Sequence, residues 1–217
     1  MKKTRKITLI GMFSAIAYIF TLIGHFVPIS FADFLRYDPK DAIIVIAGFS
    51  LGPMAALIIS VIVSFLELIT ISTTGFIGFG MNVLSSAAFA CIAALVYKWV
   101  KGIRGAVIGL VLSSLTTVGL MILWNYIVTP LYMGVPRDAV ATMILPVFLP
   151  FNAIKCTLNS ALVLLIYKPC MNALRLMGLM PKRALAEGEK EHKISIALTI
   201  VASVIVVAMV ALFIILK

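Results

Sequence analysis

Three polar residues stand at regular spacing within one otherwise apolar stretch of the sequence: Asn152, Lys155 and Asn159. Offsets of three and seven residues place them on one face of an α-helix, because each residue advances by about 100°. An amide offers a donor and an acceptor together, and an ammonium offers three donors. This set suits a planar heterocycle that alternates carbonyl groups and ring nitrogens. We therefore expect Asn152 and Lys155 to bind such a ligand, whereas for Asn159 hydrogen bonding between helices is as good an interpretation.

Glu67 and Lys155 are charged residues within apolar stretches, where an ion is costly to bury. An ion pair between the two would hold their helices together. Because ionisable groups inside a membrane usually serve a function, we favour a wet pocket that one or both of them line. The two interpretations are compatible if the pair forms part of the pocket wall.

The preceding apolar stretch contributes a further amide, Asn125, between Trp124 and Tyr126. Asn125 stands near the end of its predicted helix and Asn152 near the start of the next, so two antiparallel helices can bring these amides to one level. Trp124 and Tyr126 are also typical of the aromatic belt at a membrane surface. Phe151 could stack on a flat ligand, although a core or lipid-facing position is more common for phenylalanine.

Polar residues in the connections could reach the hydroxyl groups of a ligand that has a polar chain. One group follows the first apolar stretch, and another surrounds a glycine-rich segment that we predict as a loop over residues 72–80. The spacing of its glycines permits a close backbone approach or a moving lid. Solvated loops explain most of these residues equally well. The candidates are Tyr37, Asp38, Asp41, Thr73, Thr74 and Asn82.

Small residues gather on the first predicted helix, where Gly11, Ser14 and Ala15 lie close together. Small side chains four residues apart let another helix approach closely. The partner helix could belong to the same bundle or to another subunit.

Signatures of other protein classes are weak or missing. The segment 48–52 spells a hydrolase motif around Ser50, but that motif needs a strand, a sharp turn and a histidine base. The zinc-protease motif H-E-x-x-H does not occur. The P-loop motif G-x-x-x-x-G-K-[ST] does not occur either, so any ATP hydrolysis would have to come from another subunit. The three cysteines form no C-x-x-C pair, and we expect no disulfide, no metal, no cofactor and no catalytic residue.

The elements that must position these residues are membrane helices. Of the 217 residues, 63% are hydrophobic and only 12% are charged, and the mean hydropathy is +1.17. A soluble protein of this size needs more polar surface. We predict an all-α integral membrane protein, with a six-helix bundle whose second span is short and one additional C-terminal span. The predicted spans are about 7–27, 42–51, 54–71, 81–99, 106–129, 147–167 and 194–216.

Lysine and arginine placement predicts the orientation. The net charge of +10 lies in short clusters between the apolar stretches, which favours membrane topology signals over nucleic-acid binding. With a cytoplasmic N-terminus, thirteen of the eighteen lysines and arginines fall on the inner side. We expect the first apolar stretch to be retained rather than cleaved as a signal peptide. The bundle would comprise residues 1–180, followed by a charged cytoplasmic linker at 181–193 and the additional helix at 194–217.

Five segments resemble the substrate-binding S components of energy-coupling-factor (ECF) vitamin transporters, and among them the riboflavin-specific branch. They are GMFSAIAYIF, FLRYDPKDAIIVIAGFSLGP, FLELITISTTGFIGFGMN, WNYIVTPLY and LPFNAIKCTLNSALVLLIYKP. The last two are the most specific for that branch, whereas the first is shared broadly among S components. The resemblance covers about residues 2–181, and the span at 194–216 departs from the family's six helices.

This resemblance implies a six-helix bundle in the cytoplasmic membrane of a prokaryote, open outward over a vitamin pocket. The positions that match the family's flavin-ring contacts are Asn125, Asn152 and Lys155, and its pocket residues near the outer loops correspond to Tyr37 and Glu67. The face around Gly11 and Ala15 would dock the transmembrane T subunit, and two ABC ATPase subunits would complete the importer.

Three alternatives remain open at this point. The chain could be an S component for another vitamin, an intramembrane serine protease that uses Ser50, or a scaffold that binds no ligand. Flavin absorbance of the purified protein would favour riboflavin, and labelling of Ser50 by a serine-reactive probe would favour the protease.

Overall fold

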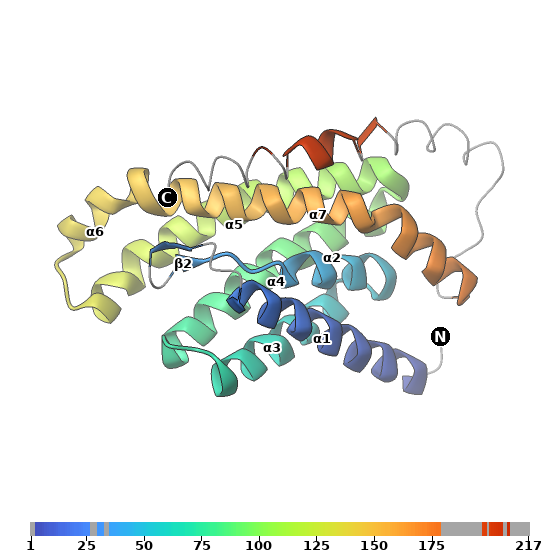
Figure 1. Ribbon diagram of the computed structural model, residues 1–217, viewed down its shortest axis with the longest axis horizontal. Coiled ribbons are helices and arrows are strands. Elements are labelled where there is room, and N and C mark those ends of the chain that lie inside the picture. Colours follow the sequence, from blue (N-terminus) through green and yellow to red (C-terminus); the bar gives the residue numbers. More distant parts are fainter. Residues whose placement is uncertain are drawn as a thin grey trace.

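Six helices make up the bundle in the described part of the chain, and they follow the six predicted spans in order (Figure 1). The computed structural model describes residues 3–26, 30–32, 35–178, 197–198, 200–205 and 208, with the backbone alone at 30–32 and 35–36. The predicted all-α fold class is therefore confirmed. The six helices are α1 (Lys3–Phe26), α2 (Lys40–Leu51), α3 (Pro53–Thr70), α4 (Gly75–Trp99), α5 (Gly102–Met133) and α7 (Leu149–Leu176).

The short helix α2 lies at the centre of the bundle. Among the described residues, five helical segments are long and apolar enough to cross a membrane, namely α1, α3, α4, α5 and the continuous segment 137–176. The 12 residues of α2 rise only about 18 Å, against about 30 Å for the hydrocarbon core. Every residue from Lys40 to Phe49 is buried, because α2 packs against α1, α3, α4 and α7. Protein rather than lipid surrounds it, so it does not have to match the membrane thickness.

A sharp turn at Gly52-Pro53 joins α2 to α3. Gly52 has a φ of 93°, which a residue without Cβ adopts readily. Pro53 begins α3, where its missing N–H costs nothing. The break between the predicted spans at 42–51 and 54–71 is therefore confirmed.

The connection between α1 and α2 contains a small antiparallel ribbon that the sequence analysis did not anticipate. Its strands are β1 (Ser30–Ala32) and β2 (Leu35–Arg36). In Figure 1 the ribbon lies beside α7, on the same end of the bundle as the start of α2. The chain then enters α2 directly at Lys40.

The glycine-rich segment 72–80, predicted as a loop, is largely helical. Helix α4 begins at Gly75, so the connection from α3 is only 71–74. At Gly78 the Thr74 side chain fills the place that a Cβ would occupy. The loop prediction was wrong because glycine favours loops on average, whereas here the glycines lie in the first turns of a long helix.

Residues 130–142, which lie between the predicted spans at 106–129 and 147–167, are mostly helical as well. Helix α5 continues through Pro130 to Met133 and ends at Gly134, whose φ is 66°. A short helix α6 (Arg137–Met143) and a π-helical turn η1 (Ile144–Phe148) then run without a break into α7. The start of α7, which carries Asn152, is thereby held on a continuous helical support.

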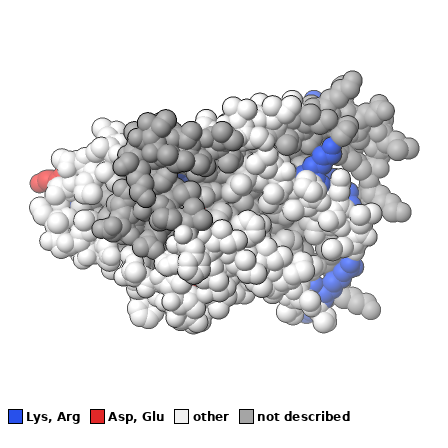
Figure 2. All heavy atoms as spheres, viewed as in Figure 1, with Lys and Arg blue, Asp and Glu red and all other residues white. Residues whose placement is uncertain are grey.

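Charge is distributed unequally between the two ends of the bundle (Figure 2). Blue spheres of lysine and arginine gather at the right of that view, where α1 begins and α7 ends, and a carboxylate marks the opposite end. The described basic residues near that end are Lys3, Arg5, Lys6, Lys98, Lys101, Arg104, Lys168 and Arg175. This asymmetry is the one on which the predicted orientation depends, so we refer to the basic end as the predicted inner end and to the other as the predicted outer end.

The predicted linker at 181–193 lies outside the described residues, as does most of the predicted additional helix at 194–217. The described residues of that last segment are helical, and Leu198 packs against the hydrophobic core. The additional membrane span remains a prediction.

Candidate ligand-binding site

A cavity opens at the predicted outer end, between α1, α3, α4, α5, α7 and the connection before α2. The space between its lining residues, including the part that is open to solvent, amounts to about 870 Å³. Most of its lining is polar, which is unusual within a bundle as apolar as this one. The polar lining residues are Thr21, His25, Tyr37, Asp38, Glu67, Ser72, Thr73, Thr74, Asn82, Ser85, Asn125, Asn152 and Lys155.

Most of the ligand contacts predicted from the sequence meet at this cavity. The lining includes Tyr37, Glu67, Asn125, Phe151, Asn152 and Lys155. These residues come from four separate segments spread over more than half of the chain. Asn159 is the exception among the predicted contacts, because it lies outside the lining.

Two of the three amides on the lining, Asn125 and Asn152, are held by bonds within their own helices. The Asn125 amide donates to the Met121 carbonyl at 2.7 Å and accepts from the Thr129 hydroxyl at 3.0 Å. The Asn152 amide donates to the Phe148 carbonyl at 2.8 Å. An amide has two N–H donors and two acceptor lone pairs. Each side chain is therefore fixed in orientation and still has capacity for a ligand.

Lys155 contributes a buried ammonium to the same wall. Its Nζ lies 3.4 Å from an Asp41 carboxylate oxygen and 3.4 Å from the Ser85 hydroxyl. The sequence analysis considered an ion pair between Lys155 and Glu67. That pairing was wrong, because Lys155 pairs with Asp41 from α2 and Glu67 has a different partner.

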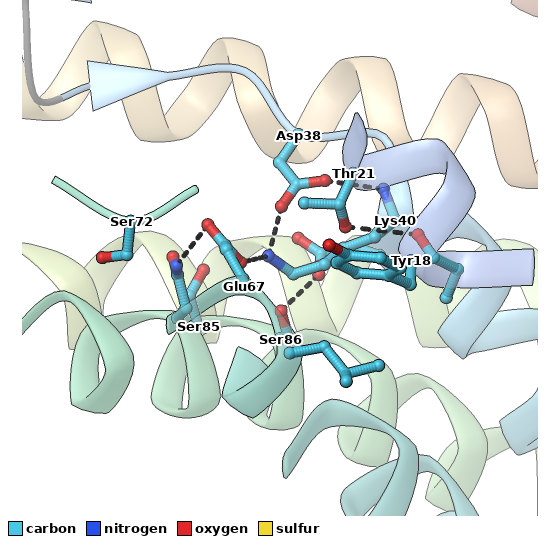
Figure 3. A network of polar contacts seen from close by, with 12 residues as sticks. Tyr18, Thr21, Asp38, Lys40, Glu67, Ser72, Ser85 and Ser86 are labelled. Carbon is cyan, nitrogen blue, oxygen red and sulfur yellow. Dashed lines mark hydrogen bonds and ion pairs between the residues drawn. The ribbon is translucent and has the colours of Figure 1, made fainter. Parts of the chain in front are cut away.

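Glu67, on α3, faces the cavity across from α7 and is held on both sides. One carboxylate oxygen accepts from the Asn82 amide at 2.8 Å, and the other lies 2.7 Å from the Lys40 ammonium (Figure 3). The same ammonium contacts the Asp38 carboxylate. The Asp38 and Glu67 carboxylates, which both line the cavity, thus share the Lys40 ammonium, which lies outside the lining.

Lys40 contacts two residues of the lining, and the sequence analysis did not single it out. It is fully buried at the start of α2. The available signal was the sequence Asp38-Pro39-Lys40-Asp41, in which opposite charges alternate directly before an apolar stretch. A lysine between two acids at the start of a helix that is buried on all sides needs local partners.

Asn159 lies outside the cavity lining and bonds to two residues of the lining instead. Its amide donates to the Asp38 carbonyl at 3.1 Å and accepts from the Tyr37 hydroxyl at 3.4 Å. Burial raises the pKa of the Tyr37 hydroxyl, and the nearby charges of Asp41 and Asp38 raise it further, so Tyr37 stays a protonated donor. For Asn159 the structural interpretation offered by the sequence is the one that the geometry supports.

Apolar side chains complete the cavity. Phe151, Met121, Met81 and Ile71 belong to the lining, and Phe151 packs in a small buried cluster with Phe148. Among the described residues, no group of three or more histidine, cysteine, aspartate or glutamate side chains could hold a metal ion. The lining of the site therefore combines apolar side chains with amides, two carboxylates and one ammonium.

The small residues on α1 divide between two faces. Gly11 and Ala15 are exposed, and nothing lies within 4 Å of the place a Cβ on Gly11 would occupy. Ser14 is buried, with its hydroxyl bonded to the Ile10 carbonyl at 2.8 Å. Ser14 therefore faces the bundle, whereas Gly11 and Ala15 face outward, and the docking role of this group stays a prediction.

Ser50, the nucleophile of the protease alternative, lies near the other end of α2. Its hydroxyl donates to the carbonyls of Ile46 and Ala47. His25 lines the cavity at the predicted outer end, and His192 lies outside the described residues. In the part of the chain that the structure describes, no histidine is placed to activate Ser50.

Comparison with known proteins gives a consistent result at the level of sequence families. Residues 5–167 match the family described as "ECF transporter, substrate-specific component". The riboflavin transporter RibU of Staphylococcus aureus (strain TCH60) is 27% identical over 181 residues, which cover 81% of this chain and 95% of the relative. The riboflavin transporter FmnP of Bacillus subtilis (strain 168) is 26% identical over 162 residues, covering 70% and 85% respectively.

A solved structure shows the same fold. It is described as the structure and mechanism of the S component of a bacterial ECF transporter, and it superposes with a TM-score of 0.68 at 27% identity. The match covers 80% of this chain and 99% of that one. The part of this chain left over is thus comparable in size to the predicted linker and additional helix.

Proposed function

The chain belongs to the family of substrate-specific components of ECF transporters, and on that premise we propose that it binds riboflavin and delivers it for import. The family consists of substrate-binding membrane components rather than enzymes. Both of the curated relatives described above are riboflavin transporters. The observation that carries the proposal is the placement of Asn125, Asn152 and Lys155 on one cavity, from two different helices.

These three side chains match the hydrogen-bonding edge of a flavin ring. That edge presents two carbonyl oxygens, ring nitrogens that accept, and one N–H that donates. The Lys155 ammonium can donate to a carbonyl oxygen, while the amides of Asn125 and Asn152 can donate and accept side by side. Because their helices already fix the amides, little side-chain entropy is lost when the ring binds.

The rest of the cavity suits the other two parts of riboflavin. The dimethylbenzene end would pack against the apolar lining, which includes Met81, Met121 and Phe151. The hydroxyls of the ribityl chain would meet the acidic side of the cavity, where Glu67 and Asp38 can accept hydrogen bonds. A neutral, partly polar vitamin of this shape uses both kinds of wall.

The absorbance spectrum of the protein purified in detergent tests the proposal. Riboflavin carried through purification would give flavin bands near roughly 450 nm, a property of the bound group and not of the polypeptide. Protein stripped of ligand should then quench the fluorescence of added riboflavin in a saturable titration. Saturable binding of a different vitamin, with none of riboflavin, would instead make this chain an S component for that vitamin. Absence of any ligand binding would support a scaffold.

We further propose that the exposed face around Gly11 and Ala15 docks the transmembrane T subunit, with two ABC ATPase subunits completing the importer. The proposal requires a cytoplasmic N-terminus, as the basic residues predict. Small exposed residues allow a partner helix to come close, and Gly11 has open space beside it.

Gly11→Trp tests the docking face. The variant should bind riboflavin like the wild type but abolish riboflavin uptake in cells that contain the other subunits, because the indole would hold the partner helix away. Leu115→Trp, at an exposed position on α5, is a matched control that should leave uptake intact. Normal uptake by the Gly11 variant would show that docking uses another face.

A further inference from the structure

The first two residues of α2, Lys40 and Asp41, carry opposite charges and are both deeply buried. Lys40 is 0% exposed and Asp41 is 2% exposed. Neither belongs to the lining of the cavity. Charges buried this deeply are stable only when paired and hydrogen-bonded, so their partners show what the two residues do.

Lys40 holds the acidic side of the cavity. Its ammonium lies between the Asp38 carboxylate, from the connection before α2, and the Glu67 carboxylate, from α3 (Figure 3). The backbone N–H of Lys40 also donates to Asp38 at 3.0 Å. Both carboxylates face the cavity, and without a shared cation they would repel each other.

Asp41 holds the basic side. One of its carboxylate oxygens lies 3.4 Å from the Lys155 ammonium, and the other accepts from the Ser86 hydroxyl of α4. Lys155 faces the cavity from α7. One turn of one central helix therefore contacts charged groups on opposite walls.

We propose that Lys40 and Asp41 are positioning residues of the binding site. Each is a fixed counter-charge beside the cavity: Lys40 holds the Asp38 and Glu67 carboxylates in place and offsets their mutual repulsion, and Asp41 orients the Lys155 ammonium. The inference rests on the proposed riboflavin binding, because that ligand provides the measurement. It adds that two residues without ligand contact control the affinity of the site.

Lys40→Met is the first test, read as the riboflavin Kd from fluorescence quenching between pH 5.5 and pH 8. Met has a similar shape without the charge. At pH 8 the two carboxylates lose their cation, and we expect binding at least about tenfold weaker than in the wild type. At pH 5.5 the carboxylates can share a proton, so the defect should shrink to about threefold or less. A purely structural role for Lys40 would give a defect that does not change with pH.

Other titratable groups face this turn of α2, and the comparison is designed around them. They are Tyr37, Asp38, Glu67, Lys155 and Cys156, and His25 lines the same cavity. Because the wild type contains all of them, the ratio of variant to wild-type Kd at each pH isolates the effect of removing the ammonium. The same substitution is then made in a Glu67→Gln background, where only one carboxylate remains to be held. There, the increase in Kd caused by Lys40→Met should be at least about threefold smaller than the increase it causes in the wild type.

Asp41→Asn is the second, independent test, and it decides the matter if the Lys40 variant does not fold. The amide keeps the shape and can still accept from Ser86, but it loses the charge that holds Lys155. We expect riboflavin binding at least about fivefold weaker, with the melting temperature within about 4 °C of the wild type. Lys101→Met and Asp138→Asn, which remove exposed charges elsewhere, should change neither quantity.

The outcomes separate this inference from the proposed function. If the wild type itself does not bind riboflavin, the proposed function fails. If the wild type binds but Asp41→Asn and folded Lys40→Met bind as tightly as the wild type at pH 8, the positioning role is overturned and riboflavin binding stands. Weakened binding in both variants, with the pH-dependent defect confined to Lys40→Met, supports the role.

Discussion

The two ends of the bundle handle buried polar groups in opposite ways. At the predicted inner end, the hydroxyls of Tyr97 and Tyr167 lie 3.0 Å apart and bond to each other. The rings of Phe49 and Tyr97 stack with their centres 4.3 Å apart. At the predicted outer end, the amides and charges stand around a cavity of about 870 Å³ and keep hydrogen-bonding capacity toward it.

Packing at the predicted inner end leaves little room for even a methyl group. A Cβ on Gly48 would come within 2.9 Å of the Ala94 side chain, and one on Gly109 within 2.8 Å of the Ala93 carbonyl. Contacts this short are not tolerated in close-packed protein interiors. The helices approach one another there through small residues, as membrane helices commonly do.

The comparison teaches how to interpret a polar residue at membrane depth. Both ends contain buried polar side chains, so burial of a polar group alone does not mark a binding site. What distinguishes the outer end is residual bonding capacity directed at the cavity, with each side chain already held by bonds to other residues of the bundle. By this criterion Asn125, Asn152 and Lys155 are ligand-binding candidates, whereas Tyr97 and Tyr167 are structural.

The largest effect on riboflavin binding is expected from Lys155→Ala. This change removes a donor from the cavity and leaves Asp41 without its counter-charge. Losing one partner of a buried charged contact typically costs about 2–5 kcal/mol, so affinity should fall at least about thirtyfold. Titration of riboflavin fluorescence measures the Kd, with Lys98→Ala, at an exposed position on α4, as the control. Unchanged affinity would show that the polar face of α7 is structural at this end too.

A smaller effect is expected from Asn152→Ala, because a neutral amide is lost and no charge is left unpaired. Loss of one buried polar contact should weaken binding about tenfold, equivalent to about 1.4 kcal/mol. Asn172→Ala is the matched control, since Asn172 is exposed at the other end of the same helix. If Asn152→Ala bound riboflavin as tightly as the Asn172→Ala control, the ligand would not use the remaining hydrogen-bonding capacity of Asn152.

Much of this arrangement could be predicted from the sequence, since it depends on local spacing. The offset of three between Asn152 and Lys155 places both on one helical face whatever the tertiary structure. The position of Asn125 near the opposite end of an antiparallel neighbour then requires only the helix count. The lengths of the apolar stretches likewise predicted the spans, and the dipeptide Gly52-Pro53 is typical of a turn such as the one that ends α2.

The pairing of the charges could not be predicted in the same way. Lys40 looked like a loop residue because its burial arises from four helices that surround α2, and no local pattern encodes their packing. The partner of Lys155 could have been Glu67 or Asp41 by charge alone, and only the depth of α2 decides between them. Asn159 shares a helical face with Asn152, yet the connection that carries Tyr37 and Asp38 covers it.

The smallest effect on riboflavin binding is expected from Tyr97→Phe, which sharpens the comparison from the inner end. The variant removes one hydroxyl from the pair with Tyr167 and keeps the stacked ring. A hydrogen bond of this kind contributes about 1 kcal/mol to stability, which should lower the melting temperature by about 2–4 °C in a protein of this size. The riboflavin Kd should stay within about twofold, because no group near the cavity changes. A clear loss of affinity at an unchanged melting temperature would mean that the two ends are energetically coupled, and that the packed inner end helps to shape the site.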